Sequence, residues 1–316
     1  MAPRFPIPTG LLALCLIATA ATPAPTQQRL RERLAQRMEP QRAAAGRADR
    51  ATTPAGARVE RDIAYGPHPR QRYDVYLPTH PRPDAPVLLM VHGGGWRTGD
   101  KALARVVDHK AAWWLDQGFI FVSVNYRLVP DADPLTQARD VAAAVAAVQR
   151  RATAWGGDPG RLLLMGHSAG AHLVALLGSD PALLRHAGAR RPLGVVSLDS
   201  GALDVPTLMA QPRLPQLYRD AFGSDPAFWA SASPRQQLRR RALPMLLVCS
   251  STRRFPTAPC AEARSFAAHA AALQVPMQVL PEALTHSEIN DNLGLPSAYT
   301  TKVQAWIERV LMQVSR

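Results

Sequence analysis

The chain has 316 residues, of which 47% are hydrophobic and 19% charged, and it carries a formal net charge of +13. This length and apolar content suffice for a large domain with a buried core, and they exclude fibrous, collagen-like and wholly disordered proteins. Only Lys101, Lys110 and Lys302 among the 37 basic residues are lysines, and the arginines are scattered along the chain, which argues against nucleic-acid binding.

Residues 1–25 have the pattern of a secretory signal peptide. Arg4 precedes the apolar run 11–17, and small residues follow around Ala21. That run is shorter than the roughly 20 apolar residues that a membrane-spanning helix needs, and no later stretch of the sequence is long enough. We therefore expect an exported chain, periplasmic or secreted, without a transmembrane segment.

Residues 26–56 are rich in Ala, Arg, Gln, Pro and Thr, and their large apolar residues are Leu30, Leu34 and Met38. A few helical turns with one apolar stripe cannot bury enough surface to be stable alone. The composition therefore predicts a flexible basic linker, followed by a catalytic domain over residues 57–316.

Beyond residue 57, short apolar runs alternate with helical patterns, which is typical of an α/β fold with a mostly parallel sheet of about eight strands and helices on both faces. The continuous run 87–91 indicates a strand buried on both faces, and the first two strands are expected to form an antiparallel edge hairpin. The predicted strands are 59–64, 73–77, 86–91, 120–125, 162–165, 194–198, 244–249 and 277–280. The predicted helices are 103–117, 135–155, 169–177, 261–273 and 296–314.

Residues 205–241 interrupt this alternation after the sixth strand, so we interpret them as an insertion. Ligands of parallel sheets collect at the carboxyl edge, and an aromatic-rich insertion there often supplies pocket walls. We expect a substrate pocket walled by Trp96 and by the insertion residues Leu214, Tyr218, Phe222 and Trp229.

The sequence Gly166-His167-Ser168-Ala169-Gly170 lies between a predicted strand and a predicted helix. A sharp strand–turn–helix connection strains the serine backbone and lifts its oxygen clear of the sheet, and glycines two positions away avoid collisions with neighbouring backbone. The flanking elements make this G-x-S-x-G match far more specific than the motif alone.

A glycine triplet, His92-Gly93-Gly94-Gly95-Trp96, directly follows the strand that ends at Val91. A carbonyl attacked by Ser168 becomes an oxyanion, which requires N–H donors on backbone that can approach closely. We expect Gly94 and Gly95, together with the amide of Ala169, to form this oxyanion hole.

These two motifs, with Asn125-Tyr126-Arg127-Leu128 and Asp158-Pro159, resemble the α/β-hydrolase superfamily, and within it the carboxylesterase and kynurenine-formamidase-like branch. The resemblance spans about residues 63 to 306, almost all of the predicted domain. It implies that Ser168 is the nucleophile.

In this fold the histidine of the triad follows the last strand. His286 fits, because it lies between the predicted strand 277–280 and the final helix, whereas His269 falls inside a helix. His167 and His172 flank the serine too closely for triad geometry. Its expected role is to take the Ser168 proton and return it to the leaving group.

The sequence departs from the family pattern at the triad acid. Relatives usually carry an aspartate just after the strand that corresponds to 244–249, but the loop 250–260 contains no carboxylate. Glu262 is the next acidic residue, although a helix start explains it equally well. Asp199 or Asp204, after the sixth strand, is the alternative, a location that some lipases use.

Cys249 and Cys260 are the two cysteines that remain once the signal segment is removed. In an exported protein a disulfide between them is the expected state, and it would brace the loop that lacks the acid. We find no metal motif such as H-E-x-x-H and no phosphate-binding loop, so neither metal nor cofactor is expected.

The sequence therefore predicts an exported serine esterase that cleaves small carboxylic esters through an acyl-enzyme at Ser168. A formamidase or amide hydrolase of the same fold is the nearest alternative. The empty acid position also leaves open a weakly active or inactive hydrolase-fold protein that binds a ligand. Fold and triad leave the natural substrate undetermined.

Overall fold

The computed structural model describes residues 49–80 and 84–313. The predicted signal peptide 1–25, and the part of the predicted linker up to residue 48, lie outside the described residues. Residues 49–56, also assigned to the linker, contact the start of the helix α2 (Ala104–Asp116). The Ala51 N–H donates to Ala102 O at 2.7 Å, and the Thr52 N–H donates to Asp108 Oδ1 at 2.9 Å.

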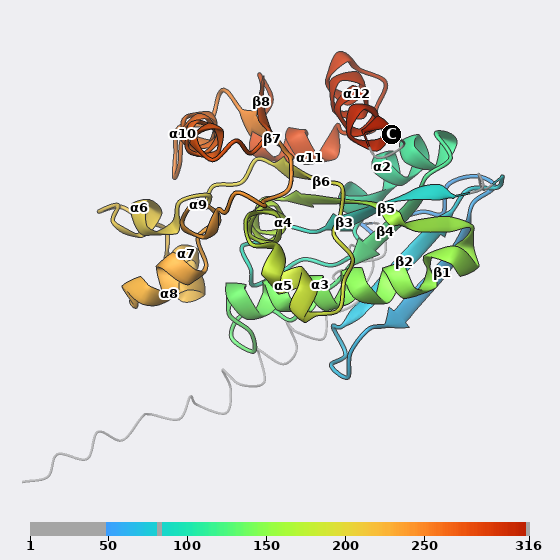
Figure 1. Cartoon of the computed structure of the whole chain (residues 1–316), viewed down its shortest axis with the longest axis horizontal. Coiled ribbons are helices and arrows are strands. Elements are labelled where there is room, and N and C mark those ends of the chain that lie inside the picture. The colour runs from blue at the N-terminus through green and yellow to red at the C-terminus, as the bar shows by residue number, and fades with distance from the viewer. Residues whose placement is uncertain (1–48, 81–83, 314–316) are drawn as a thin grey trace, which may run out of the picture. The chain divides into compact units, whose positions relative to one another are not determined.

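Eight strands form one sheet in the order β1-β2-β4-β3-β5-β6-β7-β8, which confirms the predicted α/β fold (Figure 1). The β1 and β2 strands form the expected antiparallel edge hairpin, β2 also runs antiparallel to β4, and all other neighbours are parallel. The strands are β1 (Arg58–Ala64), β2 (Arg72–Leu77), β3 (Ala85–Val91), β4 (Ile120–Val124), β5 (Gly157–His167), β6 (Gly194–Leu198), β7 (Met245–Ser250) and β8 (Met277–Glu282).

Side chains of the central strands alternate between two hydrophobic cores, one on each face of the sheet. In β3, Val87, Leu89 and Val91 belong to one core and Leu88 and Met90 to the other. All five are fully buried, which explains why the sequence of β3 is continuously apolar rather than alternating.

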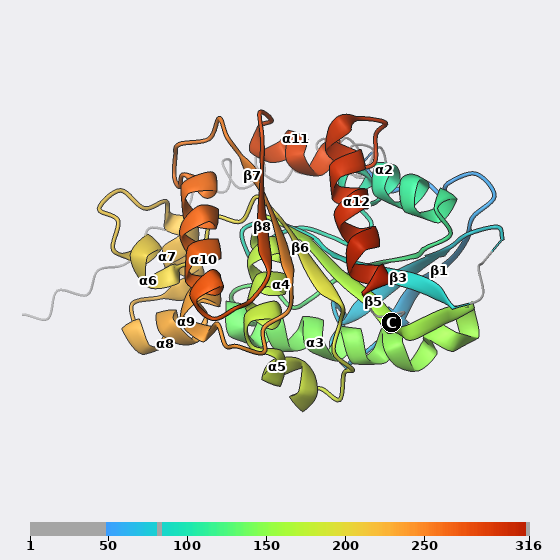
Figure 2. The ribbon, with the colours of Figure 1, turned by 45° about the horizontal axis from the view of Figure 1, so that its top comes forward.

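Helices cover both faces (Figure 2). One core includes residues of α3, α4, α5 and α10, and the other includes residues of α2, α11 and α12. These helices are α3 (Pro134–Arg151), α4 (Ala169–Ser179), α5 (Pro181–His186), α10 (Pro259–Ala272), α11 (His286–Asp291) and α12 (Ala298–Met312). A 3₁₀ turn, η1 (Ala152–Trp155), follows α3.

The predicted insertion after β6 consists of four short helices joined by loops. They are α6 (Val205–Met209), α7 (Gln216–Phe222), α8 (Pro226–Ser231) and α9 (Pro234–Gln237). Proline occupies one of the first two helical positions in α6, α8 and α9, where its missing N–H has no helical acceptor to lose.

The carboxyl ends of β3, β5, β6, β7 and β8 lie at one edge of the sheet, because these strands are mutually parallel. This edge therefore brings together the glycine triplet, Ser168, Asp199, the loop after β7 and His286. In the described part of the chain, no helix combines the length and the apolar character needed to cross a membrane.

Candidate active site

Ser168 occupies a strained turn between β5 and α4, with φ 56° and ψ −116°. Its N–H donates to Leu198 O on β6 at 3.0 Å, so the turn is fastened to the neighbouring strand. A Cβ on Gly170 would lie 2.2 Å from Val91 O, and one on Gly166 would lie 2.4 Å from Gly170 O. Only glycine fits at both positions, which explains the G-x-S-x-G pattern physically.

The glycine triplet turns tightly beside Ser168. Gly94 and Gly95 have φ +118° and +59°, and a Cβ on Gly93 would lie 3.0 Å from the Ser168 Cβ. Within the described residues, the backbone N–H groups of Gly94, Gly95 and Ala169 donate to no backbone or side-chain acceptor. These are the three amides that the sequence predicts as oxyanion donors.

His286 and Asp199 form a hydrogen-bonded pair across the carboxyl ends of β6 and β8. The Nδ1 of His286 lies 2.6 Å from Asp199 Oδ2. Because a carboxylate can only accept, Nδ1 carries the proton and Nε2 is the basic nitrogen. His286 is the first residue of α11, whose start is fixed by a capping box between Thr285 and Glu288.

Three donors surround the fully buried Asp199 carboxylate. Besides His286, Ser250 N–H donates to Oδ1 at 2.7 Å and Arg253 Nη2 lies 2.9 Å from Oδ2. Burial alone raises the pKa of Asp199, but the His286 hydrogen bond, the charge of Arg253 and the Ser250 amide outweigh it, and the net pKa lies below its usual value. Asp199 is therefore ionised at neutral pH.

Glu262, the first candidate for the triad acid, does not contact His286. Its Oε1 accepts hydrogen bonds from the backbone N–H groups of Leu203 at 2.6 Å and Asp204 at 3.1 Å. Burial raises the pKa of Glu262 to about 7. The helix start at α10 thus directs this carboxylate towards the insertion, and the alternative residue, Asp199, occupies the position beside the histidine.

The histidines near Ser168 are neutral and already hydrogen-bonded. Burial lowers the pKa of His167 to about 3 and that of His172 to about 4. His167 Nε2 lies 2.9 Å from the backbone oxygen of His286, and Trp96 Nε1 donates to His172 Nδ1 at 3.2 Å. Neither ring is therefore available as a general base.

Ser168 and His286 line a common cleft of about 280 Å³. The glycine triplet forms one wall, and Arg105, Asn290 and Asp291 lie on the side of α2 and α11. Polar groups therefore border the space next to the serine on that side.

Trp96 and the insertion residues that the sequence predicts as pocket walls are not among the residues that line this cleft. The Trp96 ring instead packs edge-on against Tyr218 and Phe222, with centroids 5.7 and 4.9 Å away. Leu214 is buried in the same core, and Trp229 packs against it, donating from Nε1 to Phe222 O. These side chains form the insertion's own core because burying one another removes the most apolar surface from water.

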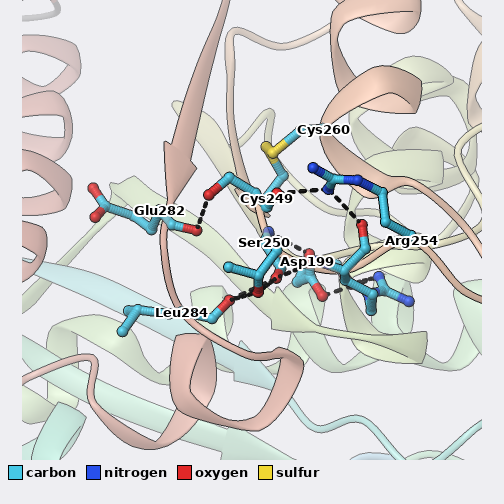
Figure 3. Close-up of a disulfide and its surroundings, with 10 residues drawn as sticks. Asp199, Cys249, Ser250, Arg254, Cys260, Glu282 and Leu284 are labelled. Atoms are coloured by element: carbon cyan, nitrogen blue, oxygen red, sulfur yellow. Dashed lines mark hydrogen bonds and ion pairs between the residues drawn. A yellow bond between two sulfur atoms is a disulfide. The ribbon is translucent and has the colours of Figure 1, made fainter.

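Cys249 and Cys260 form the expected disulfide, which links the end of β7 to the start of α10 (Figure 3). The bridge closes the loop that carries Ser250 and Arg253. Ser250 lies between Asp199 and Leu284 in this view, and its Oγ donates to Leu284 O at 2.6 Å. The loop therefore contacts both the acid and the segment that leads into His286.

Sequence reasoning missed Ser250 and Arg253, the two residues that bind Asp199 from the β7 loop. The available signal was the absence of a carboxylate from a loop with two arginines and several hydroxyl groups. Among the residues that the structure describes, no cluster of three or more His, Cys, Asp or Glu is arranged to bind a metal ion.

Comparison with known proteins supports the fold. Residues 73–185 match the family BD-FAE. The esterase LipQ of Mycobacterium tuberculosis is 30% identical over 230 residues, which are 66% of this chain and 51% of LipQ. A probable isoprenylcysteine alpha-carbonyl methylesterase, ICME, of Oryza sativa subsp. japonica is 31% identical over 169 residues, which are 52% of this chain and 40% of that protein.

The chain thus spans about half or less of the length of these curated relatives. Among solved structures, esterase B from Lactobacillus Rhamnosis aligns with a TM-score of 0.66 at 21% identity, covering 91% of this chain and 97% of that one. The resemblance to the α/β-hydrolase superfamily, expected from the sequence, is confirmed, and the fold is that of the α/β-hydrolases.

Proposed function

We propose that this α/β-hydrolase is a serine esterase that cleaves carboxylic esters of small alcohols or acids. The observation that carries the proposal is the contact of 2.6 Å between His286 Nδ1 and Asp199 Oδ2, in a cleft that Ser168 also lines. An inactive ligand-binding protein would not need a buried, ionised carboxylate against this histidine, because burying a charge is costly unless it is paired.

In this mechanism Ser168 attacks the ester carbonyl while His286 Nε2 accepts the serine proton. Asp199 holds the ring in the tautomer that exposes Nε2 and stabilises the imidazolium that forms. The amides of Gly94, Gly95 and Ala169 bind the oxyanion. His286 then protonates the leaving alcohol, and a water molecule, activated by the same histidine, releases the acid from Ser168.

The strained backbone of Ser168 and the steric fit of Gly166 and Gly170 support the nucleophile assignment. The loss of one oxyanion donor typically costs about 3–4 kcal/mol of transition-state stabilisation. Several relatives are named esterases, which agrees with the proposal. One relative of 33% identity, from Danio rerio, is a kynurenine formamidase, so amide hydrolysis is the alternative to be tested.

We further propose that the chain is exported, with residues 1–25 as a signal peptide and residues 26–56 as a basic linker, whose last residues, 49–56, contact the catalytic domain. The disulfide between Cys249 and Cys260 supports an oxidising compartment. The net charge of +13 comes from arginines scattered along the chain, so we propose no nucleic-acid partner.

The test is an assay of the protein, purified without reductant, on p-nitrophenyl esters of increasing acyl length, with formamides and anilides in parallel. We expect ester turnover, its loss in Ser168→Ala, and a preference for short acyl chains because the cleft holds only about 280 Å³. Faster turnover of formamides than of esters would assign an amide hydrolase, and no turnover of any substrate by the folded protein would contradict the proposal.

A further inference from the structure

The loop after β7 carries a positive charge where the family resemblance places a negative one. Residues 250–260 contain no carboxylate, but they include Arg253. The Arg253 side chain is only 14% exposed, and its Nη2 lies 2.9 Å from Oδ2 of Asp199, whose side chain is completely buried. An arginine so far removed from water next to a buried carboxylate is not an ordinary surface ion pair.

Arg253 and His286 share one oxygen of the acid. Both Arg253 Nη2, at 2.9 Å, and His286 Nδ1, at 2.6 Å, contact Asp199 Oδ2. The other oxygen is bound by the Ser250 N–H. With all of its close contacts made by donors, the carboxylate is held in one orientation, and the guanidinium offsets the cost of its burial.

The same loop also reaches the segment that carries the base. Ser250 Oγ donates to Leu284 O, two residues before His286, and it accepts the Arg253 N–H at 3.2 Å. The disulfide from Cys249 to Cys260 closes this loop at both ends. Arg253 is therefore fixed relative to both the acid and the base.

We propose that Arg253 is a positioning residue: its guanidinium fixes Asp199, an acid supplied by β6 rather than β7, and its charge extends activity towards acidic pH. This inference rests on the esterase function proposed above. A positive charge beside the carboxylate disfavours a second positive charge nearby, so removal of Arg253 should raise the pH below which activity is lost.

Other titratable groups surround the pair, and against the larger effect of burial the charge of Arg253 also lowers the pKa of two of them, Tyr218 and Glu262. The nearest is His167 from β5, whose ring centroid lies 4.5 Å from that of His286 and whose pKa burial lowers to about 3. Lys110 from α2 donates to Asn290 O in α11, and burial lowers its pKa to about 7. Besides the effect of burial, Tyr218 of α7 and Tyr299 of α12 lie close enough to Asp199 for its charge to raise their pKa values, and Arg105 and Asp291 line the cleft together with His286.

The test compares Arg253→Gln, Arg253→Lys and the matched control Arg254→Gln by the pH profile of kcat/KM. Arg254 lies in the same loop, but its guanidinium donates to backbone oxygens of Ser251 and Arg253 and not to Asp199. In Arg253→Gln we expect the acidic midpoint to rise by about one pH unit. We also expect the plateau value of kcat/KM to fall by about tenfold, because Asp199 loses one of the donors that hold its carboxylate in place.

Arg253→Lys keeps the charge but loses the fixed fork of donors, so it should retain the acidic midpoint and recover only part of the plateau. The control should match the parent in both quantities. A loss of plateau in Arg253→Gln without a shift of the midpoint would reduce Arg253 to a structural residue and overturn the proposal. Should Arg253→Gln fail to fold, a shifted midpoint in Arg253→Lys would overturn it equally.

A second readout does not depend on ester hydrolysis. NMR of the protein with labelled histidine rings follows the titration of the His286 ring, which is identified by its loss in His286→Gln. We expect its midpoint in Arg253→Gln to lie about one pH unit above that of the parent. A shift without ester turnover would refute the esterase function and support the role of Arg253. Unchanged ring titration in an active enzyme would refute the role of Arg253 alone.

Discussion

Ser168, the proposed nucleophile, and the proposed acid–base pair of Asp199 and His286 are held in place by different means. Ser168 is fixed by backbone geometry, since a single atom added to Gly166 or Gly170 would collide with main-chain oxygens. His286 and Asp199 are fixed by side chains and loops from β6, β7 and β8, through hydrogen bonds, an ion pair and a disulfide. The first arrangement tolerates no change of shape, whereas the second depends on charge, protonation and redox state.

The largest effect that distinguishes the two carboxylates is expected from Asp199→Asn. The amide can present an N–H to His286 and thereby favour the wrong tautomer, so kcat/KM should fall by about four orders of magnitude. Glu262→Gln is the matched control, and it should change kcat/KM by less than about threefold, because the hydrogen bonds of Glu262 come from the backbone N–H groups of Leu203 and Asp204 and not from His286. A greater loss in the control than in Asp199→Asn would return the acid role to Glu262.

On the nucleophile side, Gly170→Ala should lower the free energy of unfolding by about 4 kcal/mol, because its Cβ would overlap Val91 O and His92 O. Gly188→Ala serves as the control: Gly188 has φ +74° but no atom within 4 Å of the added Cβ. The cost there should be about 1 kcal/mol, from backbone conformation alone. Urea unfolding measures both, and equal costs would show that the turn is not sterically fixed.

On the acid–base side, Cys249→Ser combined with Cys260→Ser should lower the free energy of unfolding by about 3 kcal/mol, since the bridge closes a loop with a sequence separation of 11. Activity at low temperature should fall by less than about tenfold, because Ser250 and Arg253 retain their contacts with Asp199. Unfolding with and without reductant provides the comparison. Unchanged stability after reduction of the bridge would contradict this account.

The smallest of these effects concerns Glu262, whose pKa is raised to about 7 when folded. In the unfolded chain this carboxyl ionises near its ordinary pKa of about 4.3, so between these values the folded state binds more protons and stability falls as the pH rises. Glu262→Gln should remove on the order of 2 kcal/mol of this decline. Thermal unfolding of both proteins across this range tests it, and parallel curves would contradict a buried, neutral Glu262.

The difference between the two parts of the site also explains what the sequence could predict. The turn around Ser168 and the glycine triplet are local, so that the residues required by the geometry are adjacent in the chain. All eight strands and the long helices were predicted for the same reason: their periodicity is local. The actual β5 begins at Gly157, earlier than its apolar run suggests.

Contacts between side chains that are far apart in the sequence could not be predicted from local patterns. Asp199 and His286 are 87 residues apart, and only the order of the strands brings them together. The sequence alone does not show that the Glu262 side chain points towards the backbone of Leu203 and Asp204 rather than towards His286. The role of the aromatic insertion residues could not be predicted for a related reason. Composition cannot distinguish side chains that face a ligand from those, such as Phe222, that bury one another.

The central claim is that Ser168 is a nucleophile activated by His286 and Asp199. The most direct measurement is intact-protein and peptide mass spectrometry after reaction with a serine-directed fluorophosphonate. The account predicts one adduct per chain, on the peptide that contains Ser168, absent in Ser168→Ala and formed far more slowly in Asp199→Asn. A folded protein that forms no adduct, or forms it on another residue, would contradict it.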